Sequence, residues 1–332
     1  MGSNLSLESV TLIEERVAPG VRRIALPLPL ALRAVNVFLV EGDHGWGLVD
    51  SGLHTPEAEK VLSDALAEAG ISWADVKRLF VTHLHPDHLG MAGTFERAGT
   101  EVVMHAPEIA GAARIWGRDH AALDAVYAWF ERHGMPADVD DGMREAWLEM
   151  GERVDPVDHV VGVTDGTVIE LAGRPMRVVW TPGHTDGHAV LVDEAEGVLF
   201  AGDHVLPRIT SNVGLYPYSR PDPLGDFLSS LRRVAALQVR RVLPAHGEPF
   251  DDLAGRVEQI LAHHADRLDA CVEAVGPGER DAYAICRTLF PKLRSAHEER
   301  FALAETLAHL RRLDLSGRVA EVPGVPVRWK AL

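Results

Sequence analysis

The chain has 332 residues, of which 46% are hydrophobic and 25% charged, a balance that suits one large domain with a small one, or two medium domains. It lacks the run of about 18 apolar residues that a membrane span needs, and its start lacks a signal-peptide pattern, so we expect a cytoplasmic protein with no membrane partner. The formal net charge is −16, and from Asp251 onward there are 13 acidic and 12 basic residues, so residues 1–250 carry nearly all of the excess. This charge makes a nucleic-acid partner unfavourable without excluding one, because bound cations would offset it locally.

Strands and helices are interspersed over the first 250 residues. Short apolar segments bounded by turn residues predict strands at 34–40, 46–50, 78–82, 101–104, near 160, and at 168–171, 176–180, 189–192, 198–201 and 241–244. A helix is predicted at 55–69, where Pro56 stands in the first turn and Gly70 follows the end. A second helix is predicted at 223–236.

Two stretches are helical in pattern without intervening strands. The first is residues 107–155, which carry Trp116, Trp129 and Trp147 and predict a helical insertion. The second follows residue 250, with predicted helices at 253–275, 281–289 and 296–313 and a hairpin-like tail. This order suggests a small winged-helix-like domain, so we expect domains at residues 1–250 and 251–332.

The two cysteines, Cys271 and Cys286, lie far in sequence from the histidine-rich segments. We expect them to be free buried thiols, with a disulfide as the alternative.

Histidines and aspartates recur in four segments, each after a predicted strand. The segments are THLHPDHLG at 82–90, TPGHTDGH at 181–188, GDH at 202–204 and AHG at 245–247. Cations such as Zn²⁺ bind imidazole nitrogens and carboxylate oxygens at about 2.0–2.2 Å and leave a position for water. His83 and His85 project to one side of an extended segment, because they are two residues apart. Asp87 and His88, at the start of the next helix, can turn toward a second ion.

The other three segments place their polar residues where a strand ends. His184, Asp203 and His246 each follow a hydrophobic strand, so we expect them to converge with the first segment at one edge of a sheet. His188 suits a supporting role, and His204 points away from its neighbour Asp203 if the chain is extended there. We therefore leave both histidines out of the predicted metal ligands.

This set of motifs resembles that of the metallo-β-lactamase superfamily over roughly residues 20–250. The resemblance implies an α/β fold, an αβ/βα sandwich with two sheets back to back and helices outside. It implies two divalent metal ions, zinc first, with iron or manganese as alternatives. By the resemblance, one ion is bound by His83, His85 and His184, the other by Asp87, His88 and His246, and Asp203 bridges them. Asp50 matches the family's first motif and is expected to orient ligands.

The C-terminal helices also resemble a known arrangement. They are similar to the winged-helix-like domain of the beta-lactamase-like protein 2 group, and the glyoxalase II group places helices there too. The stretch at 107–155 is longer than either group leads us to expect, so specificity could differ.

Water activation by metal is the chemistry that this pattern favours. Two adjacent cations lower the pKa of water to near 7, and Asp87 could both bind metal and accept a hydrogen bond from the nucleophile. The leading interpretation is hydrolysis of a small-molecule ester, thioester or lactone. A nuclease or phosphodiesterase is the main alternative, suggested by the C-terminal domain, although that domain lacks a basic stripe.

Other activities are weaker interpretations. A single-iron dioxygenase could keep the same ligands. A β-lactamase is disfavoured, because by family pattern those enzymes lack the aspartate found here as Asp203. A flavodiiron reductase would need a flavodoxin domain, and a non-catalytic DNA-binding protein would be expected to have lost ligands. The sequence does not specify an oligomeric state.

Two further hypotheses concern the substrate. The aromatic helices at 107–155 either cap the metal site or serve only as core. Arg208, five residues after Asp203, can reach the mouth of the site and pair with an anionic substrate, with a surface salt bridge as the alternative. The loop that follows, with Asn212, Gly214, Tyr216 and Tyr218, has a composition suited to binding.

Overall fold

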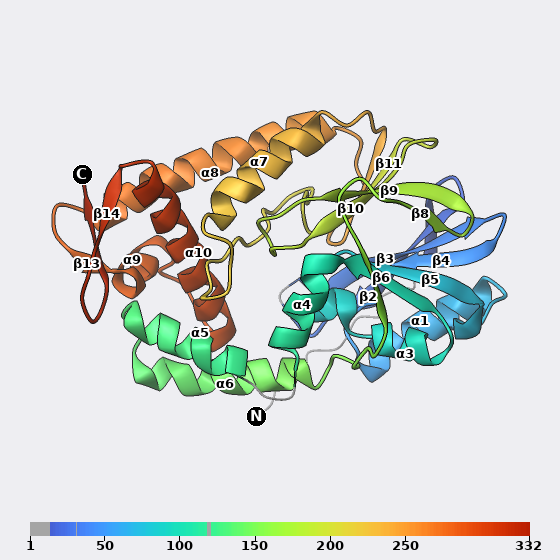
Figure 1. Ribbon diagram of the computed structural model, residues 1–332, viewed down its shortest axis with the longest axis horizontal. Coiled ribbons are helices and arrows are strands. Elements are labelled where there is room, and N and C mark those ends of the chain that lie inside the picture. The colour runs from blue at the N-terminus through green and yellow to red at the C-terminus, as the bar shows by residue number, and fades with distance from the viewer. Residues whose placement is uncertain (1–13, 31, 118–120) are drawn as a thin grey trace, which may run out of the picture.

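Two β-sheets pack face to face, and helices cover their outer faces, in the computed structural model, which describes residues 14–30, 32–117 and 121–332 (Figure 1). Within these residues, the larger sheet has the strand order β1 (Glu14–Ala18), β2 (Val21–Pro27), β3 (Ala34–Gly42), β4 (Gly45–Val49), β5 (Val76–Val81), β6 (Glu101–His105) and β7 (Val160–Val163). The smaller sheet has the order β12 (Arg241–Pro244), β11 (Val198–Gly202), β10 (Ala189–Asp193), β9 (Arg174–Trp180) and β8 (Val168–Leu171). The predicted αβ/βα sandwich is confirmed.

Strand β3 shows how the sequence builds the layers. Its residues alternate, so that Val37 and Leu39 pack on the helix side while Phe38 and Val40 pack between the sheets. Strand β10 lies between two cores, and all five of its residues are buried. Continuous apolar strands of this kind are typical of sheets that are covered on both faces.

Strands β1 and β2 were not predicted from the sequence. Strand β2 contains Arg23, which is only 3% exposed because it pairs with Glu15 at 2.9 Å and with Glu248 at 2.7 Å. A buried arginine interrupts the apolar alternation by which a strand is recognised, and only its partners from other parts of the chain explain its burial.

Helices cover both outer faces of the sandwich. On the large sheet these are α1 (Pro56–Glu68), α2 (Pro86–Leu89), α3 (Ala92–Arg97) and the short 3-10 helix η1 (Trp73–Asp75). Helix α1 begins where the Thr55 hydroxyl accepts the Ala58 N–H at 3.2 Å. Helix α7 (Pro223–Ala235) buries Phe227, Leu231 and Val234 against the small sheet.

The C-terminal region contains three helices and a small antiparallel sheet. Its elements are α8 (Leu253–Val275), β13 (Arg280–Asp281), α9 (Ala282–Leu289), α10 (Ala296–Leu315), β14 (Val319–Val322) and β15 (Arg328–Ala331). Helix α8 packs on the small sheet at its start, through Val257 and Ile260, and on the C-terminal core at its end, through Cys271 and Val275. The division into domains after residue 250 stays a prediction, and α8 joins the two cores on either side of it.

The predicted helical stretch at 107–155 contains α4 (Ala106–Ile115), α5 (Ala121–Arg132) and α6 (Ala137–Gly151). Helices α5 and α6 share one hydrophobic core with α9 and α10, although these pairs are far apart in the sequence (Figure 1). We call residues 106–151 together with 282–315 the helical cap.

The two cysteines lie in the core of this C-terminal region. Cys271 and Cys286 are free and buried, as predicted, and burial raises the pKa of each thiol to about 12. Among the described helices, none is long and apolar enough to cross a membrane.

Candidate metal centre

The predicted ligand residues meet at one edge of the two sheets. The loop that leaves β5 carries His83 and His85, and the single turn of α2 carries Asp87 and His88. The remaining three come from the small sheet, where a residue follows each of β9, β11 and β12: His184, Asp203 and His246. The strand ends thus bring together residues that lie up to 163 positions apart in the sequence, from His83 to His246.

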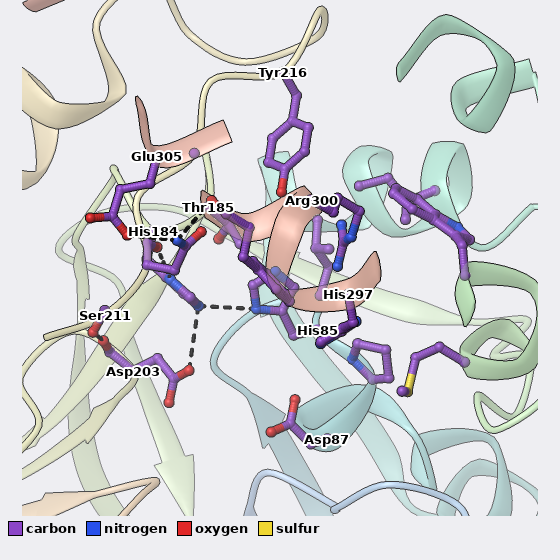
Figure 2. Close-up of a pocket in the computed structure, with 18 of the residues that line it drawn as sticks. His85, Asp87, His184, Thr185, Asp203, Ser211, Tyr216, His297, Arg300 and Glu305 are labelled. Atoms are coloured by element: carbon purple, nitrogen blue, oxygen red, sulfur yellow. Dashed lines mark hydrogen bonds and ion pairs between the residues drawn. The ribbon is translucent and has the colours of Figure 1, made fainter. Parts of the chain in front are cut away.

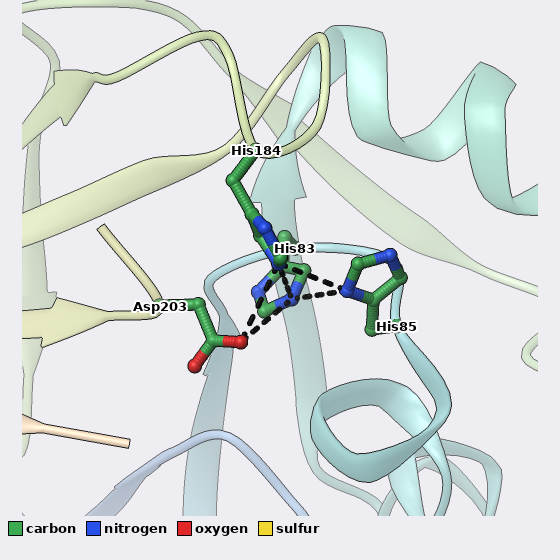
Figure 3. A group of neighbouring side chains, drawn as sticks. All are labelled: His83, His85, His184 and Asp203. Atoms are coloured by element: carbon green, nitrogen blue, oxygen red, sulfur yellow. Dashed lines mark hydrogen bonds and ion pairs between the residues drawn. The ribbon is translucent and has the colours of Figure 1, made fainter. Parts of the chain in front are cut away.

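The first group consists of His83, His85, His184 and Asp203 (Figure 3). Three ring nitrogens face one another, with His83 Nε2 3.0 Å from His85 Nδ1 and His184 Nε2 3.2 Å and 3.0 Å from these two atoms. Asp203 Oδ2 lies 3.4 Å from His184 Nε2 and 4.0 Å from His83 Nε2. Ligand atoms about 2.0–2.1 Å from a tetrahedral ion lie roughly 3.3 Å apart, so the group fits one ion.

The second group consists of Asp87, His88 and His246. Asp87 Oδ2 lies 3.4 Å from His246 Nε2 and 3.8 Å from His88 Nε2. The other oxygen of Asp203, Oδ1, turns to this group and lies 3.4 Å from His246 Nε2 and 3.6 Å from His88 Nε2. Asp203 therefore directs one carboxylate oxygen at each group.

Two histidines of the second group, and the Asp203 oxygen that faces them, have polar atoms that no described protein atom satisfies. Nε2 of His88, Nε2 of His246 and Oδ1 of Asp203 are buried without a hydrogen-bond partner among the described residues. Buried polar atoms are costly when they are left unpaired. Three such atoms that converge on one point fit a divalent cation, which would satisfy all of them.

The charges of the two groups differ. Burial lowers the pKa of His83 and His85 well below the usual range, so both rings are neutral at pH 7. Burial also lowers the pKa of His88 and His246, but nearby carboxylates outweigh it and raise the values to about 10 and about 9. These same histidines outweigh the effect of burial on Asp87 and lower its pKa to about 2. The carboxylates are therefore ionised at neutral pH.

A second set of contacts fixes the direction of each imidazole. Asp50 follows β4 with a φ of 60°, and its carboxylate accepts hydrogen bonds from the Thr82 N–H at 2.8 Å and from His88 Nδ1 at 2.8 Å. The other nitrogens of His184 and His246 bond to main-chain carbonyls, at 2.7 Å and 2.9 Å. Such bonds set the tautomer and aim the free nitrogen at a metal. The supporting contact predicted for Asp50 is present.

Neither His188 nor His204 belongs to the two groups. His188 Nε2 accepts the main-chain N–H of Asp203 at 3.2 Å, and its Nδ1 lies 2.7 Å from the Thr181 hydroxyl, so it supports the loop that carries Asp203. His204 is buried beside the ring of Phe227, at 5.3 Å between centroids.

Glu108 is a site residue that the sequence did not reveal. It is only 1% exposed, and it accepts hydrogen bonds from the N–H of Leu84 at 2.7 Å, the N–H of Gly187 at 2.6 Å and the hydroxyl of Thr185 at 2.7 Å. Burial raises its pKa to about 7. Glu108 thus ties the loop of His83 and His85 to the loop of His184. In the sequence it resembles any acid in the first turn of a helix.

A cavity of about 970 Å³ opens over the two groups (Figure 2). Five predicted ligands reach it: His85, Asp87, His184, Asp203 and His246. Its walls come largely from the helical cap, including Ile115, Trp116, Met143, Trp147, Met150, Phe290, Leu293 and Phe301. A cavity of this size holds a small organic molecule, and its lining favours one with a substantial apolar part.

The aromatic helices at 107–155 were expected either to cap the site or to serve only as core, and they do both. Trp116 and Trp147 line the cavity, whereas Trp129 packs in the core beside His133. The helices at 107–155 therefore supply both wall and core. The loop residues predicted for binding, Asn212, Gly214, Tyr216 and Tyr218, also line the cavity.

The predicted position of Arg208 at the mouth of the site is wrong. Leu206, Ile209 and Thr210 line the cavity, but Arg208 lies in a separate hollow with Arg256. Leu206, two residues earlier, is buried and lines the cavity wall instead. The arginines that do line the cavity are Arg114 and Arg300 of the cap.

Helix α10 lines the cavity, which was not predicted from the sequence. His297, Arg300, Phe301 and Glu305 line the cavity from one side of this helix, at spacings of three, one and four residues. Such spacing marks one helix face and is the signal that could have identified them.

Comparison with known proteins agrees with this architecture. The family model described as Metallo-beta-lactamase superfamily matches residues 30–246, and the one described as Metallo-beta-lactamase-like, C-terminal domain matches residues 268–330. A protein of Bacillus subtilis named probable metallo-hydrolase YqjP is 29% identical over 300 residues, which are 86% of this chain and 90% of its own. The atrochrysone carboxyl ACP thioesterase of Aspergillus fumigatus is 25% identical over 74% of this chain and 45% of its own.

Two solved structures resemble the chain over nearly its whole length. A metallo-beta-lactamase family protein of Thermus thermophilus is 39% identical with a TM-score of 0.88, and covers 96% of this chain and 100% of its own. A beta-lactamase domain protein of Burkholderia ambifaria is 31% identical with a TM-score of 0.84, and covers 96% of this chain and 94% of its own. With a family match over residues 30–246 and two His/Asp groups suited to divalent metals, the chain belongs to the metallo-β-lactamase superfamily and is a hydrolase of that superfamily.

Proposed function

We propose that the protein binds two divalent metal ions, zinc in the first instance, and hydrolyses an ester, a thioester or a lactone. The observation that carries the proposal is the carboxylate of Asp203, whose two oxygens face the two groups of side chains. His83, His85 and His184 would hold one ion, Asp87, His88 and His246 the other, and Asp203 both. Seven ligands are too many for one tetrahedral ion.

The chain's own residues define what such a site can do. When bound, the two ions lower the pKa of water and polarise the carbonyl group under attack. Asp87 lines the cavity, and its ionised carboxylate can accept a hydrogen bond from the attacking water and so aim it. The imidazoles need not move, because Asp50 and two main-chain carbonyls already fix three of them.

The lining of the cavity supports the proposed substrate class. Its cap walls are apolar and aromatic, which suits an acyl or aryl group next to the bond that is cleaved. One relative that covers 74% of this chain is named as a thioesterase, which supports a thioester among the candidates. A phosphodiester substrate is the alternative, and the substrate panel described next distinguishes it from the acyl substrates.

Metal analysis followed by a substrate panel tests the proposal. Purified protein should carry close to two metal ions per chain, and it should cleave at least one of a 4-nitrophenyl ester, an acyl thioester and a lactone faster than bis-4-nitrophenyl phosphate. Asp87→Asn should lower kcat by roughly 10²-fold or more at unchanged Tm, because the group that aims the water is lost. Asp64→Asn is the control, because Asp64 pairs with Lys60 on helix α1 and is not a predicted ligand. This variant should behave as wild type.

Two results would contradict the proposal. One is faster cleavage of the phosphate diester than of every acyl substrate, which would establish the alternative. The other is near wild-type kcat in Asp87→Asn with metal retained, which would remove Asp87 from catalysis.

A further inference from the structure

Arg300 of α10 faces the same cavity as the predicted metal ligands (Figure 2). Its guanidinium carbon lies 4.9 Å from the ring centroid of Trp147 and 4.3 Å from that of Phe301. Both rings line the cavity as well. Stacking between two rings holds the planar guanidinium in place, so its donors are already ordered before a ligand binds.

This arginine has no carboxylate partner among the described residues, although the chain has 49 acidic residues and only 33 basic ones. The acids next to it in sequence are engaged elsewhere. Glu298 accepts the main-chain N–H of Arg294 at 2.7 Å, and Glu299 pairs with Arg287 at 3.0 Å. Arginines are usually paired when they are half-buried in an acidic protein, so Arg300 has donors to spare for a ligand.

Arg114, Tyr216 and Tyr218 line the same cavity as Arg300, together with the carboxylates of Asp186, Glu298 and Glu305. Arg114 of α4 stacks on Tyr218 at 5.7 Å, and the rings of Tyr216 and Tyr218 stack on each other at 5.7 Å. Burial raises the pKa of both tyrosines, and the positive charge of Arg300 opposes this effect at each. Both hydroxyls therefore stay protonated at neutral pH and can donate hydrogen bonds to a ligand in the cavity.

We propose that Arg300 determines specificity by binding an anionic oxygen group, a carboxylate or a phosphate, at the end of a substrate whose apolar part packs on the cap. Guanidinium binds such groups with two parallel hydrogen bonds. The cavity then takes amphiphilic anions: the scissile bond lies at the metal ligands, and the charged end lies at Arg300. This inference rests on the proposed hydrolase function, and it assigns to the cap the role that the sequence suggested for Arg208.

Two esters of equal chain length test the substrate preference. One is 4-nitrophenyl octanoate, and the other is mono-4-nitrophenyl suberate, which ends in a carboxylate. Arg300→Ala should raise KM for the suberate about tenfold or more, and it should leave KM for the octanoate within about twofold. Arg300→Lys should recover part of the loss, because it restores the charge without the paired donors. Arg208→Ala, which removes a cation outside the cavity, is the matched control and should change neither value.

Dye binding tests the anion site without turnover. The probes are 1-anilinonaphthalene-8-sulfonate and N-phenyl-1-naphthylamine, which share one aromatic body and differ in the sulfonate. Arg300→Ala and the bulkier Arg300→Gln should weaken binding of the sulfonate dye about tenfold and leave the neutral dye within about twofold.

The outcomes separate the two proposals. If the wild type cleaves neither ester, nor any thioester or lactone, the hydrolase proposal fails, while the two dyes still decide the role of Arg300. If the folded Arg300 variants weaken both dyes equally, or neither, Arg300 does not bind an anion and the inference is overturned.

Discussion

The sandwich and the helical cap contribute to the site in opposite ways. The sandwich supplies seven predicted ligands from short segments at strand ends, and each segment has a motif that can be read locally. The cap supplies most of the cavity wall from helices that are more than a hundred residues apart in the sequence, and it has no motif. Metal chemistry needs fixed residue types at fixed spacing, whereas a wall needs only suitable shape and polarity. We therefore expect substitutions in the sandwich to affect turnover, and those in the cap to affect KM.

The largest effect should follow from Asp203→Ala. Among the residues that the structure describes, only the Asp203 carboxylate faces both groups of ligands. Its loss should therefore reduce the metal content below two ions per chain. Turnover should fall by roughly 10³-fold, because several kcal/mol of barrier lowering by the ions is lost. Elemental analysis and kcat measure the two effects. A variant with unchanged metal content would mean that the site is not binuclear.

A smaller effect should follow from Asp50→Asn, which acts through His88. The carboxylate lies 2.8 Å from His88 Nδ1, and an amide can no longer hold that ring as firmly. Metal affinity should fall about 10–100-fold, as measured by competition with a chelator. Asp193→Asn is the control: Asp193 is equally buried and pairs with Arg174, far from the ligands, so it should change Tm and not metal affinity. Equal losses of affinity in both variants would show a general folding defect.

The cap offers a matched pair of tryptophans. Trp147 lines the cavity and Trp129 does not, although both pack in the same core. Trp147→Leu should raise KM about 3–10-fold while kcat stays within about threefold. Trp129→Leu should lower the free energy of unfolding by about 2–4 kcal/mol and leave KM unchanged. If neither variant alters KM, the cap is only core, and the contrast between the two regions fails.

The smallest effect concerns a chain of hydrogen bonds that runs from helix α10 of the cap to the predicted ligand His184. Glu305 of α10 accepts a hydrogen bond from the Asn212 amide at 3.0 Å, and the Asn212 carbonyl bonds to His184 Nδ1 at 2.7 Å. Glu305→Ala should weaken metal binding about 3–10-fold, and Glu305→Gln, which keeps an acceptor, should restore it. The control is Arg311→Ala on the same helix, since Arg311 is half-buried and pairs with Asp314 rather than with Asn212 or a ligand. Equal metal affinity in Glu305→Ala and wild type would confine the cap to substrate contacts.

The ligand motifs can be read in the sequence because ligand residues follow strands and their spacing is local, and their resemblance to the metallo-β-lactamase superfamily implied the sandwich and the two groups of ligands. His83 and His85 were expected on one side of an extended segment, and their ring nitrogens lie 3.0 Å apart. Asp50 was expected to support a ligand and bonds to His88. The assignment of these residues to two bound ions stays a proposal.

Several residues around the site were revealed only by the tertiary structure. Arg23 interrupts the apolar pattern of β2, and its burial is explained only by its ion pairs with Glu15 and Glu248. In the sequence Glu108 is an ordinary acid in the first turn of a helix. Its role becomes clear only in the structure, where it accepts hydrogen bonds from the N–H groups of Leu84 and Gly187 in two separate loops. Arg208 is near Asp203 in the sequence but does not line the cavity, whereas Arg300, 97 residues beyond Asp203, does. Local spacing fixes which side chains share a strand end, but the wall of a cavity is set by how distant helices pack, and that depends on the burial of apolar surface across the whole chain.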